Sequence, residues 1–248
     1  MRPVAILQHD QTQRGGFLVR CLEQLGMTTK LFCPDDGDSL PRSAPDYSGI
    51  VLLGSNRSVN DPVDWIGEEL QLVRAAMRLD VPVLGHCFGA QMMAKSLGAH
   101  VGRNAWANIG WSRLHVTPHG SALFGADRVV GFNWHYETFA IPAGARRLLY
   151  GQHCLNKAFA IGRHMAFQCH FEVTEDIVSE WCDHAGTELA AAGGPAVQTR
   201  GQILAQMRTN LPALQATARR VYCEWARSLM LPRATCAPAC SGSRRSPG

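Results

Sequence analysis

The segment from Pro82 to Gly98, PVLGHCFGAQMMAKSLG, constrains the fold more than any other part of the chain. A short apolar strand runs directly into a helix, and glycines stand two residues before and two residues after Cys87. Small residues at those positions let the chain turn sharply and hold the residue between them above the edge of a sheet. The segment therefore predicts a buried strand, a nucleophile elbow at Cys87 and a covering helix.

The N-terminal half of the chain alternates between apolar runs and segments with helical spacing. The run GIVLL at residues 49–53 is apolar throughout, as a strand covered on both faces is. Strands that alternate with helices pack as a parallel sheet with helices on both of its faces. We therefore expect an α/β fold with an open, mostly parallel sheet flanked by helices. The expected strands are residues 3–7, 28–33, 49–53 and 81–84, and the expected helices are residues 17–25, 65–79 and 90–97.

The second half of the chain changes character twice. Short β-like runs punctuated by Gly and Pro at residues 110–168 predict hairpins, and a helix is expected at residues 174–192. After a Gly-Gly-Pro break, an apolar stripe at helical spacing predicts a long helix at residues 198–229, with a kink at Pro212. The expected organisation is one domain at residues 1–192, a helical extension at 196–230 packed on it, and a disordered tail at 231–248.

Charge and cysteine usage argue against several classes of function. The 24 basic and 20 acidic residues leave a net charge of +4, which is too small to indicate binding to nucleic acid. The nine cysteines are scattered without a C-x-x-C pair, so neither a metal site nor a thioredoxin motif is expected, and a reducing compartment is indicated. The sequence shows neither a signal peptide nor a membrane span. We expect a cytoplasmic protein without a nucleic-acid or membrane partner.

A second motif, MAFQCHFE at residues 165–172, supplies partners for Cys87. Most cysteines here are expected to be buried structural thiols, but Cys87 stands at a helix N-terminus, where the helix dipole favours the reactive thiolate. In an extended strand His170 and Glu172 project to the same side, and a carboxylate beside an imidazole leaves one ring nitrogen free as a base. An H-x-E pair alone usually marks a surface strand, so its weight comes from the elbow cysteine. The candidate catalytic residues are Cys87, His170 and Glu172.

The segment LLGSNRSVND at residues 52–61 provides a third motif, because it follows a buried strand. Ligands of open α/β sheets bind outside the carboxyl ends of the strands. A turn at Gly54 and Ser55 can present the backbone N–H of Ser55 as an oxyanion donor, beside the N–H of Phe88. Without the other two motifs, this segment would be read as an ordinary strand-to-helix loop.

Together these motifs resemble the class I, or triad, glutamine amidotransferases, in particular stand-alone proteins similar to the amidotransferase domain of GMP synthase. The family pattern G-x-C-x-G-x-Q is met from Gly85 to Gln91, and the order of the motifs agrees with the family. Ser55 stands where the family usually has a second glycine, and Phe171 replaces a common proline. The resemblance implies a flavodoxin-like fold, a triad of Cys87, His170 and Glu172, oxyanion donors at Ser55 and Phe88, and substrate contacts from Gly54, Gln91, Trp134, His135 and Glu137.

The activity implied by the resemblance is hydrolysis of the side-chain amide of glutamine through a cysteinyl thioester, which releases glutamate and ammonia. It implies no metal or organic cofactor; the partners would be glutamine, or another γ-glutamyl compound, and a separate ammonia-accepting synthetase. A γ-glutamyl peptidase or hydrolase acting on peptides or amines would use the same triad. Two alternatives of other kinds are a catalytically degenerate regulatory or binding subunit, and a redox or stress-response thiol on a related fold.

Overall fold

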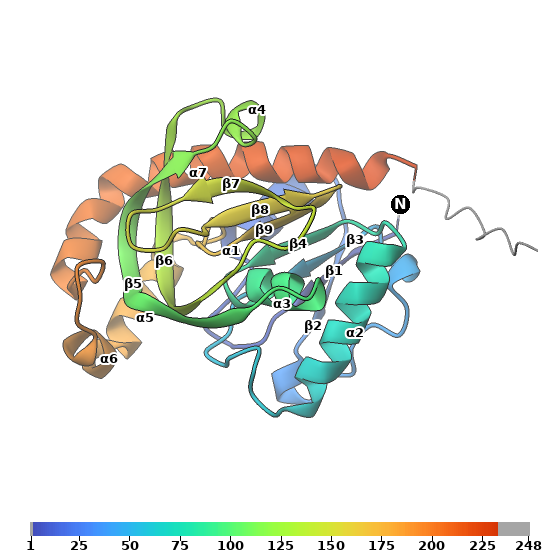
Figure 1. Ribbon diagram of the computed structural model, residues 1–248, viewed down its shortest axis with the longest axis horizontal. Coiled ribbons are helices and arrows are strands. Elements are labelled where there is room, and N and C mark those ends of the chain that lie inside the picture. Colours follow the sequence, from blue (N-terminus) through green and yellow to red (C-terminus); the bar gives the residue numbers. More distant parts are fainter. Residues whose placement is uncertain (1, 233–248) are drawn as a thin grey trace, which may run out of the picture.

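The computed structural model of the protein describes residues 2–232, and within them nine strands form one sheet in the order β2-β1-β3-β4-β9-β8-β7-β5-β6 (Figure 1). The strands are β1 (Val4–Leu7), β2 (Thr29–Phe32), β3 (Gly49–Leu52), β4 (Val83–His86), β5 (Val101–Val116), β6 (Arg128–Phe139), β7 (Arg146–Tyr150), β8 (Ala158–Ile161) and β9 (His164–Phe167). The helices are α1 (Gly16–Gln24), α2 (Asp64–Arg78), α3 (Phe88–Ser96), α4 (Ser121–Phe124), α5 (Glu175–His184), α6 (Gly186–Ala191) and α7 (Arg200–Met230), with short 3-10 turns η1 (Pro34–Asp36) and η2 (Ala44–Asp46).

The sheet has a parallel and an antiparallel half. Strands β2, β1, β3, β4 and β9 are parallel neighbours, in the order of a flavodoxin-like sheet. Strands β8, β7, β5 and β6 continue the sheet in antiparallel fashion, as hairpins. The expected α/β fold class is confirmed. Strand β5 begins at Val101, earlier than expected. The sequence did not indicate this start, because a register shift between Arg103 and Asn108 interrupts the alternating pattern of the strand.

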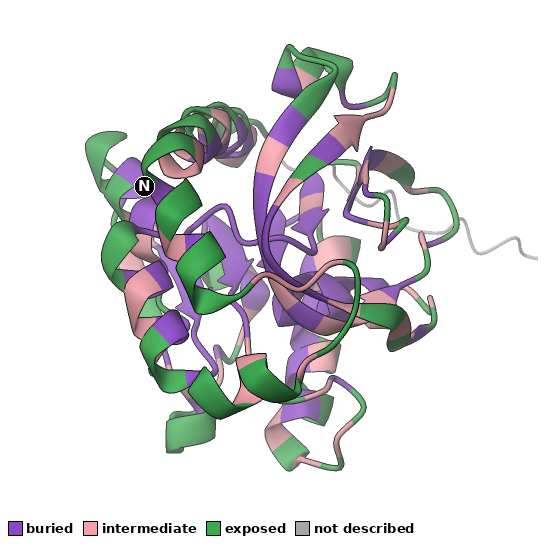
Figure 2. Ribbon diagram, turned by 90° about the vertical axis from the view of Figure 1, so that its left-hand side faces the viewer, coloured by how far each residue is buried: buried purple, intermediate pink, exposed green. Residues whose placement is uncertain are grey.

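Helices cover both faces of the parallel strands. In β1, Val4 and Ile6 face the cluster that holds α1 and α7, whereas Ala5 and Leu7 face the cluster that holds α2 and α3. This alternation follows from the two-residue period of a strand, and it explains why β1, β3 and β4 are buried at every position. Figure 2 shows the buried strands inside and exposed positions along the outer sides of the helices.

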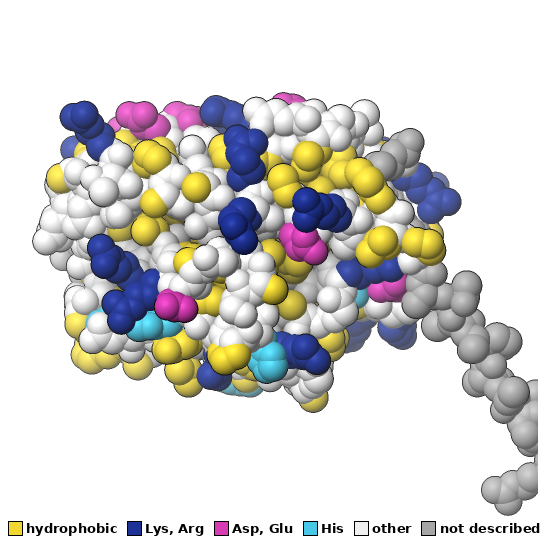
Figure 3. All heavy atoms as spheres, turned by 90° about the horizontal axis from the view of Figure 1, so that it is seen from above, with side chains coloured by type: hydrophobic (Ala, Val, Ile, Leu, Met, Phe, Trp, Pro, Cys, Tyr) yellow, Lys and Arg dark blue, Asp and Glu magenta, His cyan; other side chains and the backbone are white. Residues whose placement is uncertain are grey.

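Helix α7 lies lengthwise along one side of the molecule (Figure 1). Thr199 begins it with a capping box to Gln202, and its buried residues, among them Trp225, join the α1 side of the core. The helix continues through Pro212, where a kink was expected; the carbonyl of Arg208, which loses its N–H partner, belongs to an exposed residue and can meet water. Its outer face carries arginines interspersed with uncharged and acidic side chains (Figure 3).

The helix expected at residues 174–192 is instead two helices, α5 and α6, which meet at Ala185. Ala185 is the last buried residue of the segment and α6 buries none of its own residues, so packing on the core ends where the two helices meet. No helix among residues 2–232 has the length and apolar character needed to cross a bilayer. From residue 233 onwards, the tail that was expected to be disordered lies outside the described residues.

Candidate active site

Cys87 occupies a strained turn between β4 and α3. Its φ of 50° and ψ of −109° lie in a region that residues with a side chain rarely adopt. The two flanking glycines permit the turn: a Cβ on Gly89 would lie 2.2 Å from the carbonyl oxygen of Leu52, and one on Gly85 would lie 2.6 Å from the carbonyl carbon of Gly89. The nucleophile elbow expected from the sequence is present.

The carboxyl ends of four parallel strands meet at this edge of the sheet. β1 is followed by His9, β3 by Gly54, β4 by Cys87, and β9 by His170. Ligands of open α/β sheets bind at such an edge. The fold therefore brings together all three segments that the sequence singled out.

His170 and Glu172 form a buried pair just beyond β9. The Nδ1 atom of His170 lies 2.5 Å from Oε1 of Glu172, and the two residues are 0% and 3% exposed. We expected the pair to lie in an extended strand, but β9 ends at Phe167. The backbone N–H of His170 donates instead to the carbonyl of Phe132. The side-chain contact between His170 and Glu172 forms nevertheless.

The electrostatics of the pair favour an imidazolium beside a carboxylate. Burial on its own would lower the pKa of His170, but the charges of Glu172 and Cys87, with the hydrogen bond to Glu172, outweigh burial and raise that pKa to about 10. Burial would raise the pKa of Glu172, but the charge of His170 outweighs it and holds that pKa below its usual value. The Nε2 atom of His170 is buried and makes no hydrogen bond within the described chain.

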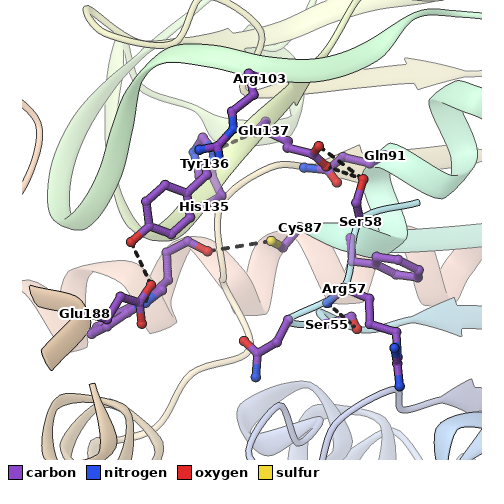
Figure 4. A pocket seen from close by; sticks show the side chains of 13 residues that line it. Ser55, Arg57, Ser58, Cys87, Gln91, Arg103, His135, Tyr136, Glu137 and Glu188 are labelled. Atoms are coloured by element: carbon purple, nitrogen blue, oxygen red, sulfur yellow. Dashed lines mark hydrogen bonds between the residues drawn. The ribbon is translucent and has the colours of Figure 1, made fainter. Parts of the chain in front are cut away.

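A cleft of about 480 Å³ opens beside Cys87 (Figure 4). The Cys87 thiol lies 3.8 Å from the carbonyl oxygen of Trp134 and 3.7 Å from Nε2 of Gln168, whose Oε1 accepts from Gln91 at 3.2 Å. Of the residues expected at the site, Gly54, His170 and Glu172 do not line the cleft. Its wall includes Ser55, Cys87, Phe88, Gln91, Trp134, His135 and Glu137 from that set.

The loop after β3 approaches the triad closely. A Cβ on Gly54 would lie 1.8 Å from Oε1 of Gln13 and 3.0 Å from Cε1 of His170, so a side chain there would require Gln13 to move. Among the hydrogen bonds of the described residues, none uses the backbone N–H of Ser55 or of Phe88. Both N–H groups are available to a ligand in the cleft.

The wall of the cleft also contains residues that the sequence did not single out. Glu188 on α6 accepts from the Tyr136 hydroxyl at 2.8 Å and from Nε1 of Trp134 at 3.2 Å, and Ser58 donates to the carboxylate of Glu137 (Figure 4). Ser58 stands within the segment at residues 52–61, and Tyr136 stands between two expected contact residues, His135 and Glu137, so these neighbours in sequence were the available signal. Glu188 had none, because only the fold brings α6 to the cleft.

His135 is fixed as a neutral ring. Its Nε2 atom accepts from the buried ammonium of Lys157 at 2.8 Å, and its Nδ1–H donates to the carbonyl of Glu137 at 2.8 Å. Burial, reinforced by the charge of Lys157, lowers the pKa of His135 well below its usual value. Lys157 also donates to the side chains of Asn108 and Asn133, so its three N–H groups are all used. His135 can thus shape the cleft but not supply a base.

A second buried histidine lies beside Glu172. His86 Nδ1 lies 3.4 Å from Oε2 of Glu172, and the Tyr222 hydroxyl of α7 lies 3.1 Å from His86 Nε2. Burial lowers the pKa of His86, which favours the neutral ring. Residues 2–232 contain no group of three or more His, Cys, Asp and Glu side chains arranged to hold a metal ion.

Residues 12–177 match a family model described as "Glutamine amidotransferase class-I". The chain is a member of this family. Its structure superimposes on that of a glutamine amidotransferase from Methylobacillus flagellatus with a TM-score of 0.90 and 34% identity, covering 95% of this chain and 97% of the other. The family and the flavodoxin-like fold expected from the motifs are confirmed.

Two further relatives of this class I glutamine amidotransferase differ in how much they share with it. A glutamine amidotransferase-like protein of Salmonella typhimurium is 27% identical over 202 residues, which cover 77% of this chain and 84% of the relative. A glutamine-hydrolysing GMP synthase of Aeropyrum pernix is 29% identical over 138 residues, which cover 55% of this chain but only 26% of the synthase.

Proposed function

We propose that this class I glutamine amidotransferase hydrolyses the side-chain amide of glutamine through a thioester on Cys87. The observation that carries the proposal is a thiol held on a strained elbow, with the buried pair of His170 and Glu172 at the same sheet edge. A nucleophile, a base and a group that orients the base are the parts required for covalent acyl transfer.

In the proposed reaction the Cys87 thiolate attacks the amide carbon, and the backbone N–H groups of Ser55 and Phe88 stabilise the resulting oxyanion. The imidazolium of His170 protonates the departing nitrogen as the C–N bond breaks, which leaves a γ-glutamyl thioester and free ammonia. His170, held by Glu172, then accepts a proton from water as the water oxygen attacks the thioester. Glutamate leaves and the thiolate returns, while the ammonia passes to a separate synthetase or to solvent.

A γ-glutamyl peptide or amine is the second candidate substrate. The cleft of about 480 Å³ falls in the size range of sites for ligands larger than one amino acid. Its wall also includes Arg103, Tyr136 and Glu188, polar side chains that could meet groups beyond the γ-glutamyl unit. In either case the bond to the γ-carbonyl carbon is the one broken, so the triad chemistry is the same.

The deciding experiment measures glutamate release by the pure protein from glutamine, a γ-glutamyl dipeptide and a γ-glutamyl amine. We expect steady turnover of at least one of them, lost in Cys87→Ser and retained in Cys154→Ser, a control at another buried thiol. An electrophilic glutamine analogue should label Cys87 alone. Labelling mainly at Cys154 or Cys169, or release that persists in Cys87→Ser, would contradict the proposal.

A further inference from the structure

A second buried histidine–carboxylate pair lies beside the site, and the proposed reaction does not use it. Nε2 of His9 lies 2.9 Å from Oε2 of Glu69 on α2, and both side chains are completely buried. The other ring nitrogen of His9, Nδ1, lies 3.3 Å from the carbonyl oxygen of Gly54. Placing a carboxylate inside a protein is costly unless it is paired, so a fully buried pair indicates a specific role.

The two contacts of His9 determine which atom carries a proton. A carbonyl oxygen can only accept, so the contact with Gly54 is a hydrogen bond only if Nδ1 is protonated. Nε2 then either donates to the Glu69 carboxylate, as part of an imidazolium, or accepts from the protonated acid. In both cases Nδ1–H donates to Gly54, and the two ring contacts are hydrogen bonds at the same time.

The Gly54 carbonyl belongs to the same peptide unit as the N–H of Ser55. In a planar trans peptide the C=O and the N–H point in opposite directions, so fixing one fixes the other. Ser55 lies on the cleft wall below Cys87 (Figure 4), and its N–H makes no hydrogen bond within the described chain. Donation by His9 to the oxygen therefore orients this N–H, and polarises it as a stronger donor.

The ring of His9 also contacts the residue that carries the second proposed oxyanion donor. It packs against Phe88 with ring centroids 4.8 Å apart, and it stacks on Trp65 at 5.3 Å with the planes 13° apart. One imidazole thus touches both halves of the proposed oxyanion site, and Trp65 and Glu69 on α2 hold that imidazole in place.

We propose that His9, held by Glu69, is a positioning residue that sets the oxyanion donors at Ser55 and Phe88. The inference rests on the proposed function, because the oxyanion forms only when a γ-glutamyl carbonyl is attacked. It makes a separable prediction: loss of the His9 contact should weaken stabilisation of the tetrahedral intermediate without changing the reactivity of the Cys87 thiol.

The test compares two variants of His9 in the full-length protein. The side-chain amide of Asn can replace Nδ1–H as a donor to Gly54, whereas that of Gln reaches towards Glu69 and leaves the carbonyl without a donor. Removing an oxyanion donor outright costs about 10²–10³ in kcat, so we expect His9→Gln, which only misorients one, to lose roughly 10-fold or more. The KM should stay within about 3-fold, and His9→Asn should recover much of the loss.

Alkylation of Cys87 by iodoacetamide is the readout that distinguishes a positioning role of His9 from a merely structural one. The alkylation proceeds without an oxyanion, so its rate should remain within about 2-fold of wild type in both variants. The control His115→Gln changes a half-buried histidine stacked on Tyr150 and should alter neither rate. If His9→Gln does not fold, Glu69→Leu serves instead, because it removes the carboxylate that holds the His9 ring in place against Gly54.

The outcomes separate the two proposals. Unchanged kcat in His9→Gln or Glu69→Leu, with normal turnover by wild type, would overturn the inference and leave the proposed function standing. Equal losses in turnover and in alkylation would also overturn it, because they would place the effect on the thiol or on folding. Absence of glutamate release by wild type from all three substrates would reject the proposed function, and the inference with it.

Discussion

At Cys87 the backbone holds a conformation that costs a residue with a side chain on the order of 1–3 kcal/mol. Such a conformation persists only where the surroundings leave no alternative. Here the backbone N–H of Cys87 donates to the carbonyl of Phe167, and Gly85 and Gly89 pack closely before and after the turn. The strain keeps the thiol pointing out of the sheet edge rather than into the core.

Replacing Glu172 with Gln tests the orienting carboxylate. The change keeps the shape of the side chain but removes the charge that stabilises the imidazolium of His170, so we expect kcat to fall by roughly 10²–10⁴. A thermal unfolding midpoint close to wild type would separate this loss from a folding defect. Glu175→Gln, at an exposed position of α5, is the matched control and should retain full turnover. Wild-type kcat in Glu172→Gln would reduce Glu172 to a structural role.

At the scale of the elements, the packing of β3 against α3 depends on the absence of a side chain at Gly89. Gly89→Ala would place a methyl group against the Leu52 backbone, and overpacking of this kind typically costs 1–3 kcal/mol or more of unfolding free energy. Gly67→Ala makes the same change in α2, where the new Cβ meets nothing within 4 Å, and should stabilise the protein by about 0.5–1 kcal/mol. Urea titrations that gave both variants the same sign would refute this account.

The Tyr222 hydroxyl ties α7 to β4 by a single hydrogen bond. Tyr222→Phe leaves Nε2 of His86 buried without a partner, which should cost about 1–3 kcal/mol of unfolding free energy. Tyr150→Phe serves as the control, because Tyr150 is half-buried and its ring only stacks on His115. A loss in Tyr222→Phe no greater than in the control would mean that the hydrogen bond contributes little.

The elements that could be predicted from the sequence are those whose pattern is local. The parallel strands are short apolar runs, and the elbow and the pair of His170 and Glu172 are carried by contiguous motifs. The early start of β5 and the division between α5 and α6 were missed, because a bulge and a half-exposed segment leave no regular period. The contacts of His9 with Glu69 and of Tyr222 with His86 join segments far apart in sequence, and only the tertiary structure brings them together.

For the molecule as a whole, the buried pair of His170 and Glu172 links stability to pH. The pKa of His170 rises from its usual 6.5 to about 10 on folding, so the proton on His170 stabilises the fold fully below pH 6.5 and progressively less as the pH rises to about 10. The lowered pKa of Glu172 acts in the opposite direction: its contribution is present above the usual value of 4.5 and is lost as the pH falls through the folded pKa.

Urea unfolding at a series of pH values between 6 and 10 should therefore show a wild-type free energy that declines more steeply than that of His170→Gln. The variant contains no titrating imidazole at this position, so the difference between the two curves isolates the His170 contribution from other groups that titrate in the same range. Parallel curves would show that His170 binds its proton no more tightly in the folded protein than in the unfolded chain.

The pairing of β4 with β9 joins Leu84 to Met165, and it brings Cys87 to the same sheet edge as His170. A ribosome making this chain synthesises Cys87 long before His170 and Glu172. Contacts between distant segments also form late, because a long loop must first close. Until then the nascent chain carries an ordinary cysteine without a partner. Under the proposed function, the nucleophile therefore meets its proposed base and orienting carboxylate only after most of the protein has been made.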